Sequence, residues 1–211
     1  LHDDEGDVAV EGLRAAPDPL VDQTEEEFRA DAAVLPGVRL AGTGPLTARL
    51  WTRPAISVIG IDATRVDEAS NTIAPRARAK LSLRVAPGQD PLEARAALRR
   101  HLEQHAPFGA RVTVTERDAG KGFAAPLDSP AMQAAREAFA ASWGTTPVDT
   151  GLGGSIPFIA DLLESFPAAQ ILVTGVEDPD SRAHGANESV HLGELEKVVL
   201  AEALLLDRLT R

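Results

Sequence analysis

Gly153-Gly154-Ser155-Ile156-Pro157 is the stretch of sequence that decides the fold. Two glycines allow backbone conformations that a side chain forbids, and serine is a residue type that caps helices. We therefore predict a helix that begins at Ser155 and ends near Glu164. The first backbone amides of a helix have no partner within it and can bind a carboxylate or a phosphate. The stretch thus predicts an anion-binding turn followed by a helix.

An apolar segment and a histidine-containing loop follow this helix. Residues 170–176 (QILVTGV) are almost continuously apolar, which predicts a strand buried on both faces, as parallel strands are. Residues 178–188 are rich in turn-forming residues and contain His184. In open α/β sheets, ligands bind at the edge where the parallel strands end. We therefore expect His184, Ser155 and the glycine pair to lie together at that edge.

These motifs resemble the C-terminal part of the M20 family of metallopeptidases, the di-zinc group of aminoacylases, carboxypeptidases and dipeptidases. The dipeptidase branch is the most similar. A second block, residues 71–89 (NTIAPRARAKLSLRVAPGQ), is similar to the part of that family's lid domain that carries substrate-binding residues. The blocks follow the family's order, and the resemblance covers residues 46–211. It implies a homodimer that assembles through the lid domain.

The resemblance implies substrate contacts from both blocks, at Gly153, Gly154, Ser155, Arg84, Asn71 and Thr72. Ser155 and its neighbouring amides match the site for the C-terminal carboxylate of the substrate. Arg84 matches an arginine that pairs with the same carboxylate, for which a planar fork of donors is well suited. Asn71 and Thr72 match a lid position that contacts substrate, in some dimeric relatives from the neighbouring subunit.

The resemblance also implies zinc as the cofactor, with two ions in each full-length subunit. His184, followed by Asn187 and Glu188 as in the family, matches its C-terminal metal-ligand histidine. We recognise no other ligand and no catalytic residue, because the family's remaining ligands and its Glu-Glu pair belong to an N-terminal segment that is missing here. A bridged two-zinc site needs about five protein ligands. We therefore expect the chain alone to bind zinc weakly and to be inactive.

The full-length parent is expected to cleave the peptide bond of dipeptides with metal-activated water. Two alternatives stay open. A hydrolase of the same family could act on N-acyl or N-carbamoyl amino acids, and a non-catalytic dimerisation module could use the Ser155 helix start merely to bind an anion. Leu152, where many dipeptidase relatives carry glutamate, leaves recognition of the substrate's amino group open.

Composition excludes several classes of partner. The chain has 211 residues and a net charge of −11 without a basic run, which argues against nucleic acid and anionic membranes. It has no cysteine, so any metal must be held by His, Asp or Glu, and the cytoplasm is the expected location. No apolar run approaches the roughly 20 residues of a membrane helix. Leu1 in place of a starting methionine predicts a fragment or a processed chain.

We predict an α/β protein of two domains. Residues 1–118 are expected to form a ferredoxin-like α+β lid and dimerisation domain with an irregular N-terminal part. Its predicted elements are strands at 55–61, 78–85 and 111–115, and helices at 25–34 and 91–104. Thr24 with Glu27 forms a capping box for the first helix, and Asp90 caps the second.

Residues 119–211 are expected to form the C-terminal portion of a zinc-exopeptidase α/β domain. Ser129 begins an alanine-rich helix that ends near Trp143. The last helix has one mostly apolar face between residues 195 and 209, at helical spacing.

Three patterns imitate functional sites. His101 and His105 are spaced like the ligands of a zinc helix, but the glutamate between them is misplaced for that motif, so we predict no metal site. The glutamates 25–27 are predicted to be a solvated helix start rather than the family's Glu-Glu pair. His191 has no counterpart in the family and is predicted to be solvent-facing or structural.

Overall fold

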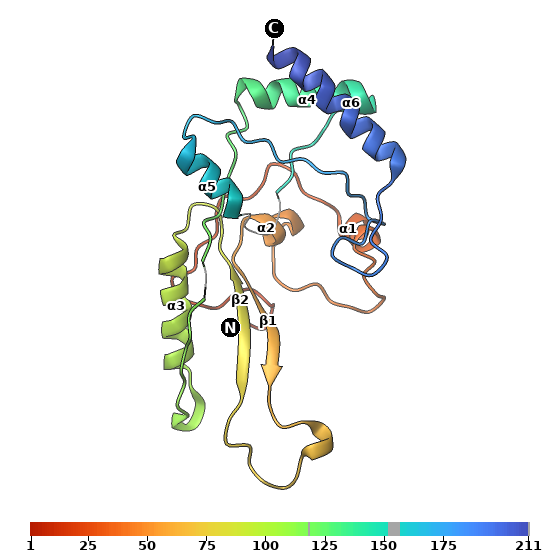
Figure 1. The fold of residues 1–211 in the computed structure, drawn as a ribbon. Helices are drawn as coiled ribbons and strands as arrows, with labels where there is room; N and C mark the ends of the chain where they lie inside the picture. Colours follow the sequence, from red (N-terminus) through yellow and green to blue (C-terminus); the bar gives the residue numbers. More distant parts are fainter. Residues whose placement is uncertain (118, 152–156, 211) are drawn as a thin grey trace. The chain divides into compact units, whose positions relative to one another are not determined.

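The computed structural model describes residues 1–117, 119–151 and 157–210 (Figure 1). The predicted anion-binding residues Gly153, Gly154 and Ser155 lie outside the described residues, so the helix start at Ser155 stays a prediction. The helix that follows it is described from Pro157 onward. No described helix is both long enough and apolar enough to span a membrane.

The described residues form two compact units, each made of segments that are distant in sequence. Unit 1 comprises Leu1–Gln23, Arg39–Gly122 and the described part of Gly151–Pro157. Unit 2 comprises Thr24–Val38, Phe123–Thr150 and the described part of Phe158–Arg211. The domain boundary near residue 118 stays a prediction.

Unit 1 is built on an antiparallel hairpin, as the alternating apolar sequence predicts. Strand β1 (Ala55–Asp62) pairs with β2 (Arg78–Arg84), so that Ala55 lies opposite Arg84 and Asp62 lies opposite Arg78. A register shift at Ile59 adds one unpaired residue to β1. Such a bulge increases the local twist of a hairpin. Helix α2 (Leu46–Trp51) precedes β1, and the short 3-10 helix η1 (Val66–Glu68) lies in the connection between the strands.

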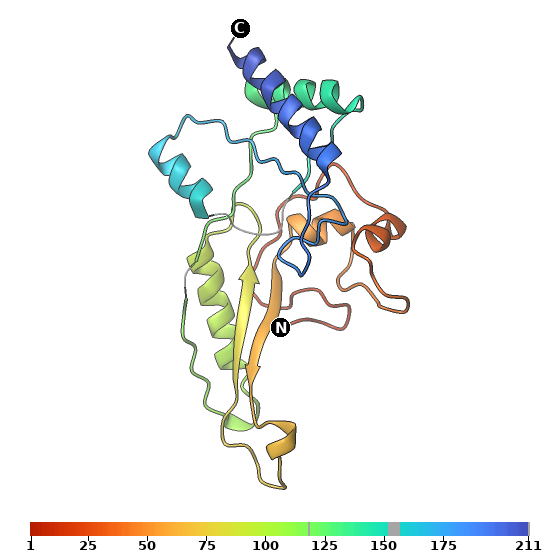
Figure 2. The same ribbon diagram turned by 45° about the vertical axis from the view of Figure 1, so that its right-hand side comes forward.

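Helix α3 (Pro91–Gln104) runs alongside this hairpin (Figure 2). It begins as predicted, because the Asp90 carboxylate accepts hydrogen bonds from the amides of Leu92 and Glu93, at 2.8 and 3.1 Å. The buried centre of unit 1 consists of Val10, Ile56, Ala97 and Leu98, flanked by partly buried leucines of β2 and the N-terminal segment. Farther along β1, Val58 and Ile61 are 50% and 70% exposed.

The strand predicted at residues 111–115 is wrong. In the structure this segment follows the 3-10 helix η2 (Pro107–Gly109) and returns along α3 without joining the sheet. Side chains of α3 hold it instead: Arg99 donates to the Val114 carbonyl at 3.0 Å, and Glu116 forms ion pairs with Arg95 and Arg99. The backbone of this segment is therefore anchored by arginines rather than by a neighbouring strand.

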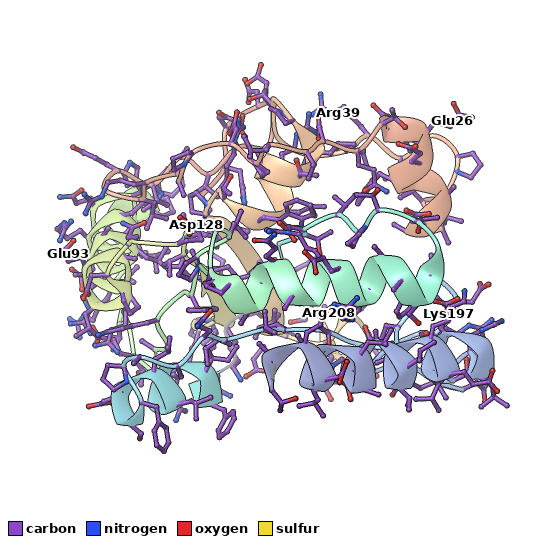
Figure 3. The ribbon with its side chains drawn as sticks, turned by 90° about the horizontal axis from the view of Figure 1, so that it is seen from above. Glu26, Arg39, Glu93, Asp128, Lys197 and Arg208 are labelled. Atoms are coloured by element: carbon purple, nitrogen blue, oxygen red, sulfur yellow. The ribbon has the colours of Figure 1, made fainter. Side chains whose placement is uncertain are left out.

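Unit 2 is helical. It contains α1 (Glu25–Asp31), α4 (Pro130–Trp143), α5 (Pro157–Ser165) and α6 (Leu192–Leu209). The predicted capping box at Thr24 is formed, although α1 ends three residues earlier than expected. Ser129 caps α4 by accepting from the amide of Met132 at 3.2 Å. Helices α4 and α6 pack side by side, as Figures 1 and 3 show.

The buried strand predicted at residues 170–176 is also wrong. The segment is irregular, and Val173 is 54% exposed. A parallel strand obtains both its hydrogen bonds and its burial from strands on either side. The described residues of unit 2 offer no such neighbour.

A polar cluster joins the ends of α4 and α6. The indole Nε1 of Trp143 donates to Glu194 at 2.7 Å, and the Lys197 ammonium donates to the other Glu194 oxygen at 2.7 Å. Lys197 also lies over the Trp143 ring, 5.9 Å from its centroid, and its carbonyl accepts from Ser142. The hydrogen bonds from Lys197 and then Trp143 lower the pKa of Glu194 below its usual value.

Glu194→Gln is expected to destabilise unit 2 at neutral pH, because it removes the charge that Lys197 and Trp143 bind. A carboxyl group whose pKa is lower in the folded state stabilises the fold at pH values above its unfolded-state pKa of about 4.5. This stabilisation is lost as the pH falls through the folded-state pKa. Urea unfolding should therefore show a lower free energy of unfolding for Glu194→Gln than for the unsubstituted chain at neutral pH. This difference should become smaller as the pH falls below about 4.5. Glu196→Gln on the exposed face of α6 is the matched control. A difference that did not change with pH would contradict this account.

Candidate functional site

His184 lies in a loop of unit 2 that is closed by its own hydrogen bonds. The amide of Ser189 donates to the Ser181 carbonyl at 3.0 Å, which joins the two ends of the loop. Ser181 is 3% exposed, and its hydroxyl donates to the Asp178 carboxylate and accepts from the Asp178 amide, each at 2.9 Å. A buried serine and an aspartate therefore form the base of the loop that carries His184.

The backbone of this loop adopts conformations that side chains rarely take. Arg182, His184 and Asn187 all have positive φ angles, of 54°, 61° and 59°. Left-handed residues other than glycine are uncommon, and they gather at functional sites, where the surrounding structure holds them. Gly185 is required for a different reason, because a Cβ there would lie 2.9 Å from the Arg182 carbonyl oxygen.

The imidazole of His184 is exposed, and none of the described residues forms a hydrogen bond with it. With respect to the described residues, its nitrogens are therefore available for a ligand. A structural zinc site needs four protein ligands and a catalytic site three. Within the described part of the chain, no group of three or more His, Asp or Glu side chains could hold a metal ion. His184 fits one position of a metal centre, and these residues do not fit a complete one.

Arg84 ends β2 in unit 1, opposite Ala55. Its side chain is exposed, and among the residues that the structure describes none pairs with the guanidinium. The opposite end of the hairpin differs, since Arg78 at the start of β2 is bound to Asp62 at the end of β1. Within the described part of the chain, the Arg84 guanidinium at the end of the hairpin next to α2 is therefore unpaired, and an unpaired guanidinium can bind a carboxylate.

Asn71 and Thr72 lie at the other end of the same hairpin. They belong to the connection between the strands, which extends away from α2 beyond the end of β1 (Figures 1 and 2). The eight residues of β1 alone span roughly 23 Å at the usual rise per residue. We call this connection the hairpin tip, and two of its apolar side chains, Val66 and Ile73, are 96% and 91% exposed. The structure therefore separates Arg84 from Asn71 and Thr72, although the family resemblance implies that all three contact one substrate.

Three histidines outside the loop have contacts that stabilise the fold. The rings of His101 and His105 stack at 4.1 Å between centroids, and His105 Nδ1 donates to the His101 carbonyl at 2.8 Å. Burial, and then the nearby His105, lower the pKa of His101. His191 caps α6, because its Nδ1 accepts from the Glu194 amide at 3.2 Å. This confirms the structural alternative that was predicted for His191.

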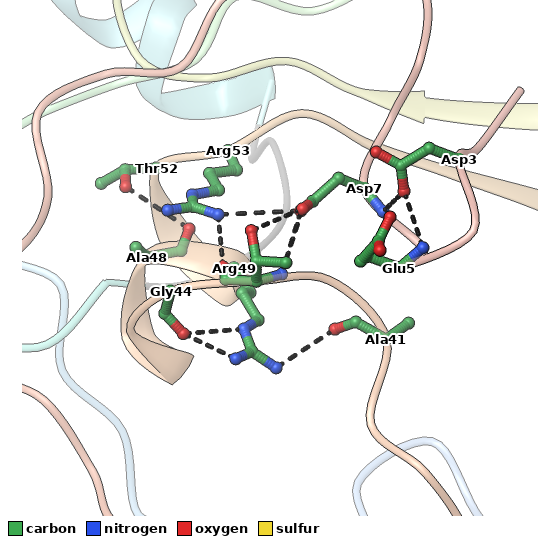
Figure 4. Close-up of polar contacts among 10 residues, drawn as sticks. Asp3, Glu5, Asp7, Ala41, Gly44, Ala48, Arg49, Thr52 and Arg53 are labelled. Carbon is green, nitrogen blue, oxygen red and sulfur yellow. Dashed lines mark hydrogen bonds and ion pairs between the residues drawn. The ribbon is translucent and has the colours of Figure 1, made fainter.

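A cluster that sequence reasoning missed surrounds Asp7 in unit 1 (Figure 4). The Thr43 hydroxyl donates to Asp7 at 2.6 Å, and this bond is the largest of the effects that lower the Asp7 pKa. Arg53 donates to the Thr43 carbonyl and lies 3.7 Å from Asp7, while Arg49 donates to the carbonyls of Gly44 and Ala41. Both guanidinium groups bind carbonyl oxygens of the 41–44 turn. The cluster therefore stabilises that turn and does not form an anion-binding site.

Comparison with known proteins agrees with the architecture of both units. Residues 1–110 match the protein family described as peptidase dimerisation domain, the dimerisation domain of M20 peptidases. Over 207 residues the chain is 35% identical to a cysteinylglycine-S-conjugate dipeptidase of Corynebacterium striatum. That alignment covers 96% of this chain and 46% of the relative. The chain thus spans about half the length of this relative.

Several solved structures share the fold. The dipeptidase Dug1p from Saccharomyces cerevisiae superposes with a TM-score of 0.75 at 18% identity, over 98% of this chain and 46% of Dug1p. The M20 family metallo-carboxypeptidase Sso-CP2 from Sulfolobus solfataricus superposes with a TM-score of 0.78 at 22% identity, over 98% of this chain and 49% of Sso-CP2. Human carnosine dipeptidase 1 superposes with a TM-score of 0.76 at 23% identity, over 98% of this chain and 46% of that protein. At these identities the likeness shows the fold alone.

Proposed function

The chain belongs to the M20 peptidase family, and from this premise we propose that it is the lid domain and the C-terminal part of the catalytic domain of a dipeptidase. The observation that carries the proposal is the 35% identity, over nearly the whole chain, to a curated dipeptidase. A cytoplasmic location is part of the proposal and fits the absence of cysteine.

Zinc is the proposed metal, and when bound it would supply an activated water for attack on the peptide carbonyl. His184 is its proposed ligand in this chain, supported by an exposed imidazole on a loop with a held, left-handed backbone. We propose that the other ligands and the general base belong to an N-terminal catalytic segment, since the dipeptidase relative is about twice as long as the matched region. No catalytic step is assigned to the residues described here.

Arg84 is the proposed partner of the substrate's C-terminal carboxylate, together with Ser155 and the amides of the Gly153-Gly154 turn. The support for Arg84 is its exposed guanidinium, which no described residue neutralises. A guanidinium can donate two parallel hydrogen bonds to a carboxylate. This arrangement would orient a dipeptide or an N-acyl amino acid by the one group that both possess.

The geometry of the hairpin favours a homodimer in which two subunits contact one substrate. An extended dipeptide spans about 7 Å, whereas Arg84 and the Asn71–Thr72 tip are separated by the length of the hairpin. Both can contact the same substrate only if the tip is supplied by a partner subunit. The exposed apolar residues Val58, Ile59 and Ile61 on β1, whose second edge is unpaired in the described structure, offer a surface for that partner.

Metal-dependent hydrolysis of dipeptides tests the proposed function. A protein that joins this chain to its N-terminal catalytic segment should cleave dipeptides, lose activity to a chelator and regain it with zinc. The 211-residue chain alone should show no turnover and weak zinc binding, because a single imidazole cannot replace a cage rich in carboxylates. Turnover by the chain alone would contradict the assignment of its missing ligands. Turnover of N-acyl or N-carbamoyl amino acids but not of dipeptides would favour the amidohydrolase alternative.

A further inference from the structure

The two faces of strand β2 differ in chemistry. Leu81 and Leu83 pack against the buried centre of unit 1, to which α3 contributes. Successive residues of a strand point to opposite faces of its sheet. The residues Lys80, Ser82 and Arg84 therefore share the other face of the hairpin, where Lys80 and Arg84 are exposed and Ser82 is partly exposed.

This second face has a local excess of positive charge. Among the residues that the structure describes, none forms a hydrogen bond or an ion pair with the Lys80 ammonium or the Arg84 guanidinium. The acidic residue of the same face is Asp62, and it accepts a hydrogen bond from Arg78 at 2.8 Å. Two unpaired cations thus lie on one strand of a chain whose net charge is −11. Such a face attracts a small anion.

The paired residues between the two cations are small. Ser82 lies between Lys80 and Arg84 on β2, Ser57 lies opposite Ser82, and Gly60 lies opposite Lys80. Four residues of a strand rise about 13 Å, and the flexible stem of a lysine can close part of that span. An extended dipeptide backbone covers about 7 Å. A dipeptide whose first residue is acidic has a second carboxylate beyond that length, so it can contact both cations.

We propose that Lys80 is a specificity-determining residue that binds a second carboxylate of the substrate, so that the enzyme favours dipeptides with an acidic N-terminal residue. This rests on the proposed function and takes from it only the contact between Arg84 and the C-terminal carboxylate. The Lys80 ammonium donates to the acidic side chain, while Arg84 holds the other end of the dipeptide. Because Lys80 is exposed, its contribution to specificity is modest.

The test compares glutamyl-glycine with glutaminyl-glycine, which have nearly the same shape and differ in one charge. In a catalytically complete enzyme, kcat/KM should be about fivefold higher for glutamyl-glycine. Lys80→Gln should abolish this preference, and Lys80→Arg should keep it, because arginine retains the charge. Lys80→Glu should reverse the preference, since the new carboxylate repels the acidic side chain.

Two controls separate a direct contact from a general effect on the fold. Arg100→Gln removes an exposed arginine that has no partner among the described residues. Arg100 belongs to α3, which packs on the leucine face of the hairpin, so this variant should keep the preference. Raising the ionic strength to about 1 M, where the Debye length is about 3 Å, should reduce the preference of the unsubstituted enzyme but leave Lys80→Gln unchanged. Circular dichroism checks that each variant is folded.

The outcomes separate this proposal from the function on which it rests. If both dipeptides are hydrolysed with equal kcat/KM, or if Lys80→Gln keeps the preference, the role of Lys80 is overturned and the dipeptidase function survives. If neither dipeptide is hydrolysed, the proposed function is overturned, and the role of Lys80 with it. Loss of the preference in Lys80→Gln, its retention in Lys80→Arg and its reversal in Lys80→Glu would support both.

Discussion

Replacing Arg84 by lysine is expected to lower kcat/KM for dipeptides about 10- to 100-fold in a catalytically complete enzyme, with a raised KM. A lysine ammonium keeps the positive charge but cannot form two parallel hydrogen bonds to a carboxylate. The loss corresponds to roughly 1.5–3 kcal/mol of charged hydrogen bonding. Steady-state kinetics with a free-acid dipeptide measure it.

The same dipeptide with an amidated C-terminus provides the substrate control. It lacks the carboxylate that Arg84 is proposed to bind, so its much slower hydrolysis should respond little to Arg84→Lys. Arg14→Lys is the matched protein control, because Arg14 is an exposed arginine of the same unit that pairs with Glu93. Equal sensitivity of the acid and the amide would show that Arg84 is structural.

Mixing two inactive variants is expected to restore activity if the hairpin tip serves the partner's site. One variant carries Arg84→Ala, and the other carries Asn71→Ala with Thr72→Ala. In a mixed dimer, one site receives an intact Arg84 from one subunit and an intact tip from the other. The second site receives both defects. Activity of the mixture should therefore exceed that of either variant, whichever of the two groups acts within its own subunit.

The controls for this experiment are each variant mixed with itself and a measurement of subunit exchange by mass spectrometry. If exchange is complete and activity is not restored, Arg84 and the tip do not serve sites in different subunits. The proposal that one substrate contacts two subunits would then be withdrawn. A monomer in solution would contradict it in a more direct way.

Helices α1, α3 and α4 were predictable because their signals are local, whereas α2 has no side-chain cap and was not predicted. Thr24, Asp90 and Ser129 each accept a hydrogen bond from an amide two or three residues farther along the chain, so a short window of sequence contains both partners. The hairpin was predictable for a related reason, since two alternating apolar segments lie close together in sequence. Boundaries were less reliable, and α1 ends at Asp31 instead of near residue 34.

The two strands that were predicted incorrectly show the limit of prediction from local sequence patterns. Residues 111–115 and 170–176 have apolar, β-branched sequences that suit a strand, but a strand exists only when a neighbour offers its backbone. The first segment is bound by Arg95 and Arg99 of α3 instead, and the second has no strand beside it in the described part of unit 2. Neither outcome can be read from the segment's own residues.

For the candidate site, the sequence alone determined which residues have suitable chemistry: an imidazole at 184, a guanidinium at 84 and the small polar residues at 71 and 72. Tertiary structure alone decided their placement. It put Arg84 and the Asn71–Thr72 tip at opposite ends of a hairpin. It also packed Gly151 against Trp51, which lies one hundred positions earlier in the chain. The physical reason is that caps and periodicity act over a few residues. Contacts between distant segments depend on how whole elements pack, and no local pattern encodes that packing.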